Sequence, residues 1–425
     1  MKRLSTLAAV TSTILSAAAV NAEGTYHRVA LLMGAQEVPP VATQASGAGV
    51  FRIDTCANTV AYYITYSCLS ATETAAHIHG AANPGVNAGV VFPLPTGNVK
   101  TGIWNYPEAL EADLLEGRLY VNVHSATSPG GEIRGQIVSA IAILDGAQEV
   151  PPTPGTGAGF GLFNIDLVNN QMDYYIAISS PLGAPETAAH IHGIARHGVN
   201  AGVLHPLPAG SPKVGTWNFT AAQGPAIMDG LTYVNIHTAA FPGGEIRGQV
   251  TPIVLPIDSR QEVPPNASTG AGHALLSLDR ATDNLGFDIR SCGLSANETA
   301  AHFHGFAPRG VNAGVLSALP AGPRKLGTWA YGPANEPGLL DGRVYINIHT
   351  TSNPGGEIRG QVEFPRPPCI GDIDCDRDVD LGDLARLLAG FGGPGSKDDG
   401  DVNGDGVVDL GDLSLLLSAF GSTCP

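Results

Sequence analysis

The chain of 425 residues is poor in positive charge. It has 22 Lys and Arg against 38 Asp and Glu, which gives a net charge of −16. Proteins that bind nucleic acid need clustered Lys and Arg to contact the phosphates, so we expect no nucleic-acid partner. Long apolar runs are also missing after residue 20. Because a membrane span needs about 20 apolar residues, we expect no transmembrane segment.

Motifs of common enzyme classes are missing as well. There is no Gly-x-Ser-x-Gly nucleophile elbow and no phosphate-binding loop, and the glycine-rich stretch 155–159 is typical of a loop. Glu37 and Glu132 recur at equivalent positions in all three copies. We therefore expect a non-catalytic protein.

Cysteines are few, and their number is even, which suggests disulfide bonds if the chain is exported. The six are Cys56, Cys68, Cys292, Cys369, Cys375 and Cys424. Cys56 and Cys68 lie at opposite ends of a predicted hairpin, too far apart for the Cα separation of about 5.5 Å that a disulfide prefers. The sequence does not fix the pairing. We favour Cys369 with Cys424, which would join the ends of the C-terminal module.

The N-terminus has the pattern of a secretory signal peptide over residues 1–22. Met1-Lys2-Arg3 precedes an apolar run from Leu4 to Val20, and small residues surround Ala22, where a signal peptidase would cut. A membrane anchor is the alternative, but Ser and Thr interrupt the run. We predict a secreted protein, located outside the cell or at its surface.

The chain contains one unit three times. The sequence Ala-His-x-His-Gly occurs at His77, His190 and His302, with spacings of 113 and 112 residues. Each copy is preceded by Gln-Glu-Val-Pro-Pro and followed by a strand-like Asn-x-His and by Pro-Gly-Gly-Glu-Ile-Arg-Gly-Gln. Solenoid repeats run to about 50 residues, so units of this length should each close their own core. We place the units at 23–140, 141–252 and 253–365, followed by a linker at 366–368 and a module at 369–425.

Each unit shows the pattern of antiparallel β-structure. Short β-branched and aromatic runs flank turn residues in all three copies, at about 50–66, 163–178 and 276–289. With 55 Gly and 32 Pro in the chain, the fold class predicted is all-β: three tandem antiparallel β-sandwich domains, or flattened barrels, plus a small C-terminal α module with two EF-hand-like loops.

The C-terminal module has a calcium-binding composition. Residues 369–425 contain twelve Asp, no Glu and three basic residues, a net charge of −9. EF-hand-type loops place oxygen ligands at positions 1, 3, 5, 7, 9 and 12 and Gly at position 6. The second loop has this Gly, whereas the first has Arg377 there. The predicted Ca²⁺ ligands are Asp372, Asp374, Asp376, Asp378, Asp380 and Asp383 in the first loop, and Asp401, Asn403, Asp405, Val407 (carbonyl), Asp409 and Asp412 in the second.

Apolar residues at helical spacing follow each loop. They are Leu384, Leu387, Leu388 and Phe391 in the first half, and Leu413, Leu416, Leu417 and Phe420 in the second. We expect two loop–helix halves that pack these apolar faces together.

Histidines are the second candidate site. In a strand, residues i and i+2 share a face, so His77 and His79 could chelate one ion with His124 from a neighbouring strand. Nine of the 13 histidines fall in this pattern: His77, His79, His124; His190, His192, His237; His302, His304, His349. Two interpretations remain open. One is a Cu or Zn site, and the other is a buried polar network of the histidines with Asn122, Glu132 and Arg134 that fixes strand register.

The repeated motifs resemble the CHRD domain, a β-rich extracellular module, over residues 24–365. The resemblance lies in His-x-His-Gly, Asn-x-His and Pro-Gly-Gly-Glu-Ile-Arg-Gly-Gln, and it implies a binding or structural module with no assigned chemistry. A fainter resemblance is to copper/zinc superoxide dismutase, a β-sandwich with His-x-His on one strand. The bridging His and the zinc-site Asp of that family have no counterpart between Gly80 and Lys100, and His197 and His205 occur in the second copy only.

Residues 369–425 resemble a type I dockerin, with paired calcium loops closed by Asp and each followed by a helix. Dockerins attach exported proteins to cohesin-bearing scaffolds, so the resemblance implies a protein or matrix partner. The Ser-Thr pair that often contacts cohesin is replaced by Leu381-Gly382 and Leu410-Gly411, which puts a cohesin partner in doubt. An accessory subunit of an extracellular polysaccharide-degrading assembly is a further alternative.

Overall fold

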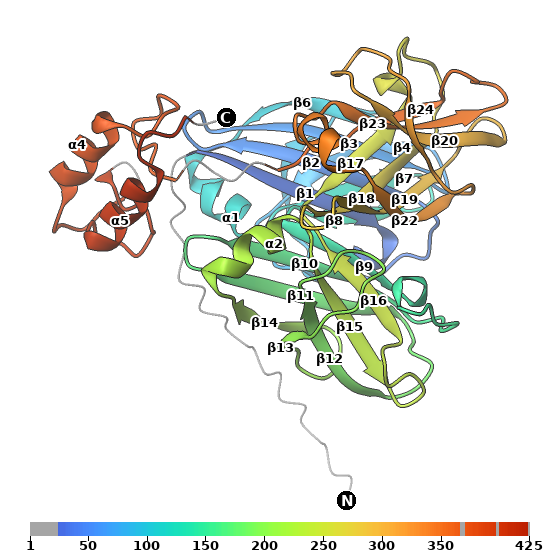
Figure 1. Cartoon of the computed structure of the whole chain (residues 1–425), viewed down its shortest axis with the longest axis horizontal. Helices are drawn as coiled ribbons and strands as arrows, with labels where there is room; N and C mark the ends of the chain where they lie inside the picture. The colour runs from blue at the N-terminus through green and yellow to red at the C-terminus, as the bar shows by residue number, and fades with distance from the viewer. Residues whose placement is uncertain (1–23, 366–369, 397–398, 424–425) are drawn as a thin grey trace, which may run out of the picture. The chain divides into compact units, whose positions relative to one another are not determined.

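The computed structural model describes residues 24–365, 370–396 and 399–423. The expected signal peptide, the linker at 366–368 and the expected Cys369–Cys424 pair lie outside these residues. The chain divides into two compact units, one with the three repeats and one with the C-terminal module (Figure 1). No helix of the described part is long and apolar enough to cross a membrane.

Each repeat forms one antiparallel sheet of eight strands, in the order β5-β4-β7-β8-β1-β2-β3-β6 for the first and the equivalent order for the others. In the first repeat, Phe92 of edge strand β5 stacks on Trp104 of the opposite edge strand β6, so the sheet rolls up. The all-β prediction is confirmed. Each domain is a single barrel-like sheet rather than a sandwich of two sheets.

The strands and helices of the repeat unit are as follows. The first repeat has β1 (Thr25–Met33), β2 (Ser46–Asp54), β3 (Thr59–Ser67), β4 (Glu73–His79), β5 (Val90–Pro93), β6 (Val99–Asn105), α1 (Glu111–Leu115), β7 (Tyr120–Ser125) and β8 (Ile133–Gln136). The second has β9 (Ala140–Asp145), β10 (Ala158–Asp166), β11 (Gln171–Ser180), β12 (Glu186–Gly193), β13 (Val203–Pro206), β14 (Lys213–Asn218), α2 (Gly224–Met228), β15 (Thr232–Thr238) and β16 (Ile246–Val250). The third has β17 (Val254–Asp258), β18 (Ala271–Asp279), β19 (Asn284–Cys292), β20 (Glu298–Gly305), β21 (Val315–Ala318), β22 (Arg324–Ala330), α3 (Glu336–Leu340), β23 (Val344–Thr350) and β24 (Ile358–Gln361).

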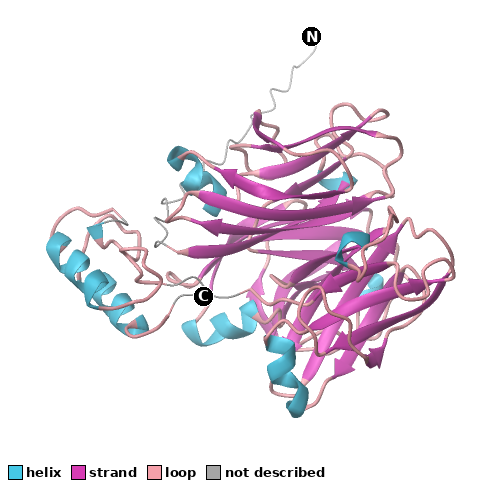
Figure 2. Ribbon diagram, turned by 90° about the horizontal axis from the view of Figure 1, so that it is seen from above, coloured by secondary structure: helices cyan, strands magenta, loops and turns pink. Residues whose placement is uncertain are grey.

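The three hairpins expected from the sequence are present. In the first, Asp54 of β2 pairs with Thr59 of β3 across the turn. The turns contain Asn58, Asn170 and Asp283 with φ of 51°, 55° and 54°, a left-handed conformation that Asn and Asp adopt more readily than other non-glycine residues. The five-residue helices were not expected from the sequence. Figure 2 shows that strands make up most of the repeat unit and that its helices are short.

The three domains pack on one another. Each has its own apolar core, and a further apolar cluster combines buried residues of all three, among them Leu31, Phe160 and Leu275. A disulfide joins Cys68 of the first domain to Cys292 of the third, with a Cα separation of 6.1 Å. The repeats therefore form one covalently tied block, and this pairing was not foreseen from the sequence.

The C-terminal unit contains helices α4 (Leu381–Gly390) and α5 (Leu410–Ala419). Its core is built from Leu387 and Leu416 with loop residues such as Val379 and Val408, all almost completely buried. The expected packing of the two halves is present in part, because Leu387 and Leu416 lie in this core and Leu384 and Leu413 pack against it. The other four apolar residues of the predicted faces are exposed: Leu388 (54%), Phe391 (43%), Leu417 (52%) and Phe420 (43%).

Candidate metal centres

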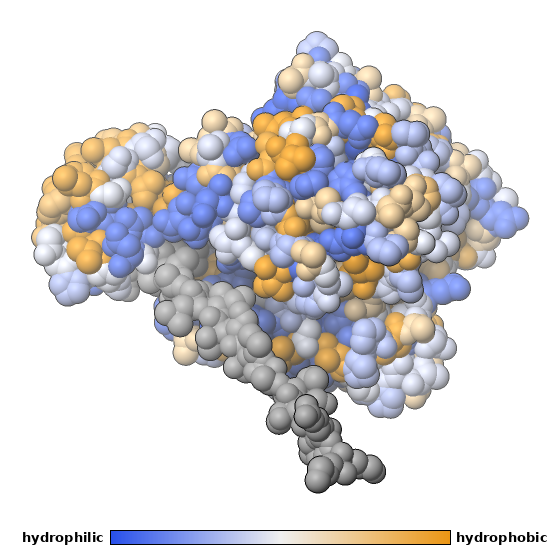
Figure 3. All heavy atoms as spheres, turned by 90° about the horizontal axis from the view of Figure 1, so that it is seen from below, coloured by the Kyte–Doolittle hydropathy of each residue, from blue (hydrophilic) through white to orange (hydrophobic). Residues whose placement is uncertain are grey.

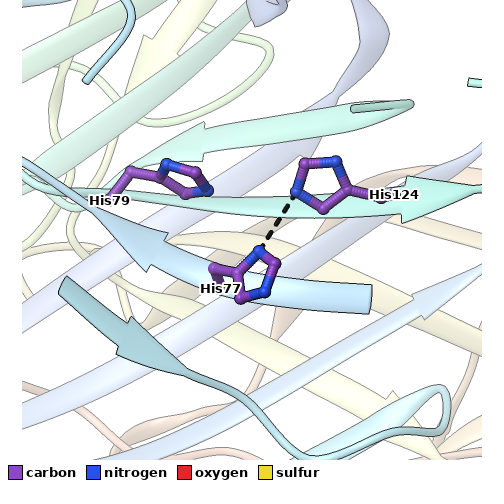
Figure 4. A group of neighbouring side chains, drawn as sticks. All are labelled: His77, His79 and His124. Carbon is purple, nitrogen blue, oxygen red and sulfur yellow. Dashed lines mark hydrogen bonds between the residues drawn. The ribbon is translucent and has the colours of Figure 1, made fainter. Parts of the chain in front are cut away.

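The structure brings the three histidines of each repeat together. His77 and His79 lie on β4, and His124 lies on the adjacent strand β7, with Ala75 opposite His124 and His77 opposite Asn122. This register puts all three imidazoles on one face of the sheet, where Figure 4 shows them facing one another. In all three repeats, one ring nitrogen from each His lies within 4.8 Å of the others. The corresponding groups are His190, His192, His237 and His302, His304, His349.

Backbone carbonyls orient two of the three rings. Nδ1 of His79 is 3.0 Å from the carbonyl oxygen of Ala88, and Nδ1 of His124 is 3.0 Å from that of Pro129. Because a carbonyl only accepts, each Nδ1 carries the proton and each Nε2 keeps a lone pair. The same 3.0 Å contacts recur for His192 with Ala201, His237 with Pro242, His304 with Ala313 and His349 with Pro354.

A layer of aromatic and cationic side chains supports the second histidine. The ring of His79 stacks on Tyr120 at 5.0 Å and 10° between planes, and the guanidinium of Arg134 lies 3.5 Å from the centre of the Tyr120 ring. Since β7 lies between β4 and β8, Tyr120 is sandwiched between His79 and Arg134. Arg134 in turn donates to Val86 and Asn87 of the loop before β5. The same stack recurs at Tyr233 and Tyr345.

Burial keeps several of these imidazoles neutral. It lowers the pKa of His79, His192 and His304 below the usual value, and the neighbouring histidines add to the effect. Burial also lowers the pKa of His124, His190 and His302. A neutral imidazole is the form that coordinates metal.

The polar network expected around the histidines is arranged differently. Glu132 is fully buried but accepts bonds from Ser70, Thr43 and Ser125 rather than from an imidazole. Burial alone would raise its pKa, but these donors hold the pKa of Glu132 below its usual value. Arg134 faces Tyr120 and the loop, as described above. Glu132 and Arg134 therefore do not satisfy the histidines.

Asn122 pairs with Glu37, a contact that the sequence did not predict. Its Nδ2 donates to Glu37 Oε2 at 3.4 Å, while Glu37 Oε1 and Asn122 Oδ1 are buried with no hydrogen-bond partner in the described part of the chain. Burial raises the pKa of Glu37 to about 7, against the opposing effects of Arg134 and Asn122. Protonation of Glu37 would supply a donor beside these two acceptors. The recurrence of Gln-Glu-Val-Pro-Pro in each copy was the sequence signal that could have indicated a role for Glu37.

The two extra histidines of the second repeat do not extend its site. His205 lies opposite Ile191 in the ladder, on the other face from His190 and His192, where it contacts Tyr174 and Trp217. His197 is 4% exposed and its Nδ1 is 3.2 Å from Ser277 Oγ in the third repeat. Neither residue provides the second half of a dinuclear centre.

In the C-terminal unit, the first Asp loop brings carboxylates close together. Asp372, Asp374 and Asp383 have oxygens within 4.8 Å of one another, as do Asp378, Asp380 and Asp383. Asp372 is 3% exposed, and its Oδ1 has no hydrogen-bond partner among the described residues. Burial, reinforced by the charge of Asp383, raises the pKa of Asp372 to about 6. Arg377, at the position expected for Gly, has φ of 77°.

The second loop has the expected glycine conformation, with Gly406 at φ of 89°. Asp401 accepts from Gly404 and Gly406, and Asp412 accepts from Asn403 and Asp409 at the start of α5. Backbone amides therefore occupy carboxylate oxygens at loop positions 1 and 12. Of the predicted ligands, Asp376 of the first loop and all six of the second loop belong to no group of three converging acidic or histidine ligands in the described residues. The six are Asp401, Asn403, Asp405, Val407, Asp409 and Asp412.

Comparison with known proteins matches the repeats. The model of the CHRD domain family matches residues 28–137, 140–250 and 254–362. A protein named chordin from Xenopus laevis is 28% identical over 289 residues, which cover 59% of this chain and 30% of that protein. Chordin from Danio rerio is 32% identical over 167 residues, 33% of this chain and 17% of that protein. No solved structure matches the chain.

The chain spans less than a third of the length of either of these relatives. The three stretches matched by the family model nevertheless make up more than half of the chain, and each contains one eight-stranded sheet with its three histidines. The protein therefore belongs to the CHRD family and contains three CHRD domains in tandem.

Proposed function

We propose that this is an exported, non-catalytic binding and structural protein. In this proposal, a block of three CHRD domains presents the same surface three times, and a calcium-stabilised C-terminal unit docks to a protein or matrix partner. The observation that carries the proposal is that all three domains expose the same pair of valines on the loop and strand beside their histidines. Export is supported by the Cys68–Cys292 disulfide, because disulfides persist mainly in oxidising compartments.

The repeated surface is partly apolar. Each domain exposes two valines at equivalent positions: Val86 and Val90, Val199 and Val203, Val311 and Val315, with exposed fractions of 39% to 56%. Val90 lies opposite His79 across the β4–β5 ladder, so it shares a face with the histidines. Isolated exposed valines are common on protein surfaces, but the same pair kept in three copies favours a repeated binding surface.

Two carboxylates that recur in every domain, Glu132 and Glu37, are poorly placed for catalysis, and a third, Glu73, is paired with Lys100. Glu132 is fully buried and its oxygens are occupied by hydroxyl and amide donors. Glu37 is 4% exposed and pairs with Asn122. A general acid or base must reach a substrate directly or through one water, and these positions favour a structural role.

The proposed calcium role rests on the crowding of carboxylates in the first loop. Asp372, Asp374 and Asp383 converge within 4.8 Å, and Asp372 is buried with one oxygen that has no partner among the described residues. Like charges at this distance repel unless a cation or a proton neutralises them. Ca²⁺ prefers carboxylate and carbonyl oxygens, and its binding would stabilise the folded unit.

The proposed docking surface is the exposed apolar stripe of the two helices. It consists of Leu381, Leu388 and Phe391 with their equivalents Leu410, Leu417 and Phe420, which are 43% to 72% exposed. Hydrophobic side chains gather on the surface of this unit, on the left of Figure 3. Exposed apolar patches of this kind mark interaction sites. The resemblance of residues 369–425 to dockerins, noted from the sequence, also favours a protein partner that binds this unit.

Calorimetry of the whole protein with Ca²⁺ or with EDTA tests the calcium part. We expect the melting transition of the C-terminal unit to rise in Ca²⁺. The variant Asp372→Asn should melt higher than the wild type in EDTA, because one repelling charge is gone, and lower in Ca²⁺, because a ligand is lost. Asp341→Asn, an exposed site in the third domain, is the control. An identical transition in Ca²⁺ and EDTA would contradict the proposal.

A further inference from the structure

We propose that each CHRD domain binds one late first-row transition ion, of the zinc class, through its three histidines, so that the chain carries three equivalent metal sites. The inference goes beyond the proposed function, which requires no metal in the repeats. The sites are His77, His79 and His124; His190, His192 and His237; and His302, His304 and His349.

The spacing of the ring nitrogens fits a tetrahedral ion. Nδ1 of His77 is 3.3 Å from Nε2 of His124, and Nδ1 of His190 is 3.3 Å from Nε2 of His237. Two nitrogens that each lie about 2.0 to 2.1 Å from a zinc ion at a tetrahedral angle are separated by about 3.3 Å. The His77–His124 and His190–His237 pairs thus already have this separation. In each trio the ligand nitrogens all lie within 4.8 Å of one another.

The second ring of each trio presents a buried lone pair with nothing to bind. Nε2 of His79, His192 and His304 has no hydrogen-bond partner in the described part of the chain, and these residues are only 8% to 9% exposed. Leaving a buried polar atom unsatisfied costs about 1 to 3 kcal/mol. This arrangement is repeated three times, and a metal ion would satisfy it in each domain.

The surroundings fix the rings as metal sites commonly do. In metalloproteins the non-ligating nitrogen of a His usually donates to a carbonyl or carboxylate, which sets the tautomer and the ring orientation. Here Ala88 and Pro129 hold Nδ1 of His79 and His124, and Tyr120 stacks on the face of the His79 ring, with Arg134 on the other side of the Tyr120 ring. The alternative network, in which Glu132 and Asn122 would pair with the imidazoles, is not formed, because Glu132 accepts from Ser125 and Asn122 donates to Glu37.

The donor set selects the class of ion. Three neutral imidazoles suit Zn, Cu, Ni or Fe, whereas Mg²⁺ and Ca²⁺ prefer oxygen ligands. None of the three groups includes a fourth His, Cys, Asp or Glu of the described residues. Three protein ligands leave one tetrahedral position open to water or to an external donor. His77 and His124 are partly exposed, so an ion can enter from solvent.

The test is a zinc titration of the whole protein, measured by isothermal calorimetry after a chelator has removed bound metal. Excess Ca²⁺ is present throughout, so that the C-terminal unit is already saturated and takes up no zinc. We expect three Zn²⁺ per chain for the wild type and two for His77→Ala. His205→Ala, which changes a histidine outside the trios, should still bind three. Co²⁺ in place of zinc should give the intense visible absorption of a tetrahedral site, a readout that needs no variant.

Either of two results would overturn the proposal. One is a zinc stoichiometry near zero together with no tetrahedral Co²⁺ spectrum for the wild type. The other is an unchanged stoichiometry in His77→Ala, which would place the ions elsewhere. Far-UV circular dichroism of His77→Ala checks that the variant is folded. The Ca²⁺ and EDTA comparison of the C-terminal unit is independent of both results.

Discussion

Replacing Glu37 with Gln should stabilise the protein at alkaline pH. Glu37 is 4% exposed, and its Oε1 and the facing Oδ1 of Asn122 have no partner among the described residues. Both atoms are acceptors when Glu37 is ionised, and a proton on Glu37 supplies the donor that this buried pair otherwise lacks within the described part of the chain. In Glu37→Gln the amide donates permanently from that position, so the variant reproduces the protonated state at every pH.

The size of the effect follows from the pKa of Glu37, which burial raises from 4.5 to about 7. The folded protein holds this proton more tightly than the unfolded chain. Wild-type stability is therefore fully present below pH 4.5 and falls as the pH rises through about 7. At about 1.4 kcal/mol per pKa unit, the loss is roughly 3 kcal/mol for this residue. Glu149 and Glu262 have the same raised pKa of about 7.

Unfolding by denaturant at a series of pH values between 4 and 9 measures this difference. We expect Glu37→Gln to match the wild type near pH 4, to exceed it by a margin that grows between pH 4.5 and about 7, and to keep a constant margin of roughly 3 kcal/mol above that. Asp341→Asn removes one negative charge at an exposed site and controls for net charge. A stability difference that stays constant across the whole pH range would refute the reasoning, since it would show that Glu37 titrates alike in the folded and unfolded states.

Two further predictions concern backbone packing and the disulfide. A Cβ at Gly131, where φ is 129°, would collide with Asn122 and Glu37, whereas an added Cβ at neighbouring Gly130 meets nothing within 4 Å. Gly131→Ala should therefore lower the free energy of unfolding by about 2 kcal/mol or more, and Gly130→Ala should lower it little. Equal losses in the two variants would contradict the packing described. The double variant Cys68→Ser and Cys292→Ser removes the disulfide and so opens a loop of 224 residues. In a chain-entropy model this should lower the free energy of unfolding by roughly 5 kcal/mol. Equal unfolding free energies for the oxidised wild type and the variant would argue against the disulfide.

The periodic features of the chain were open to prediction from sequence. The hairpins could be placed because β-branched runs and left-handed Asn or Asp turns are local signals, repeated at Asn58, Asn170 and Asp283. The shared face of His77 and His79 follows from the two-residue period of a strand. Their approach to His124 needed one further assumption, that the strands containing them are neighbours, and the β4–β7 pairing confirms it.

Features that depend on distant contacts could not be predicted. The partners of Cys68 and Glu37 lie 224 and 85 residues away, and no local pattern specifies such pairs. Glu132 was assigned to the histidine face, but it binds Ser125 and Ser70 instead. The outward-facing Leu388 and Leu417 were assigned to the core because helical spacing shows which residues share a face, without showing how much of that face is covered.

Anomalous diffraction from crystals of the whole protein soaked in zinc tests the central claim most directly. Data collected on both sides of the zinc absorption edge should show three peaks, one inside each trio of histidines and about 2.0 to 2.1 Å from the three coordinating nitrogens. Histidine trios without zinc peaks, in crystals that show zinc elsewhere, would contradict the account.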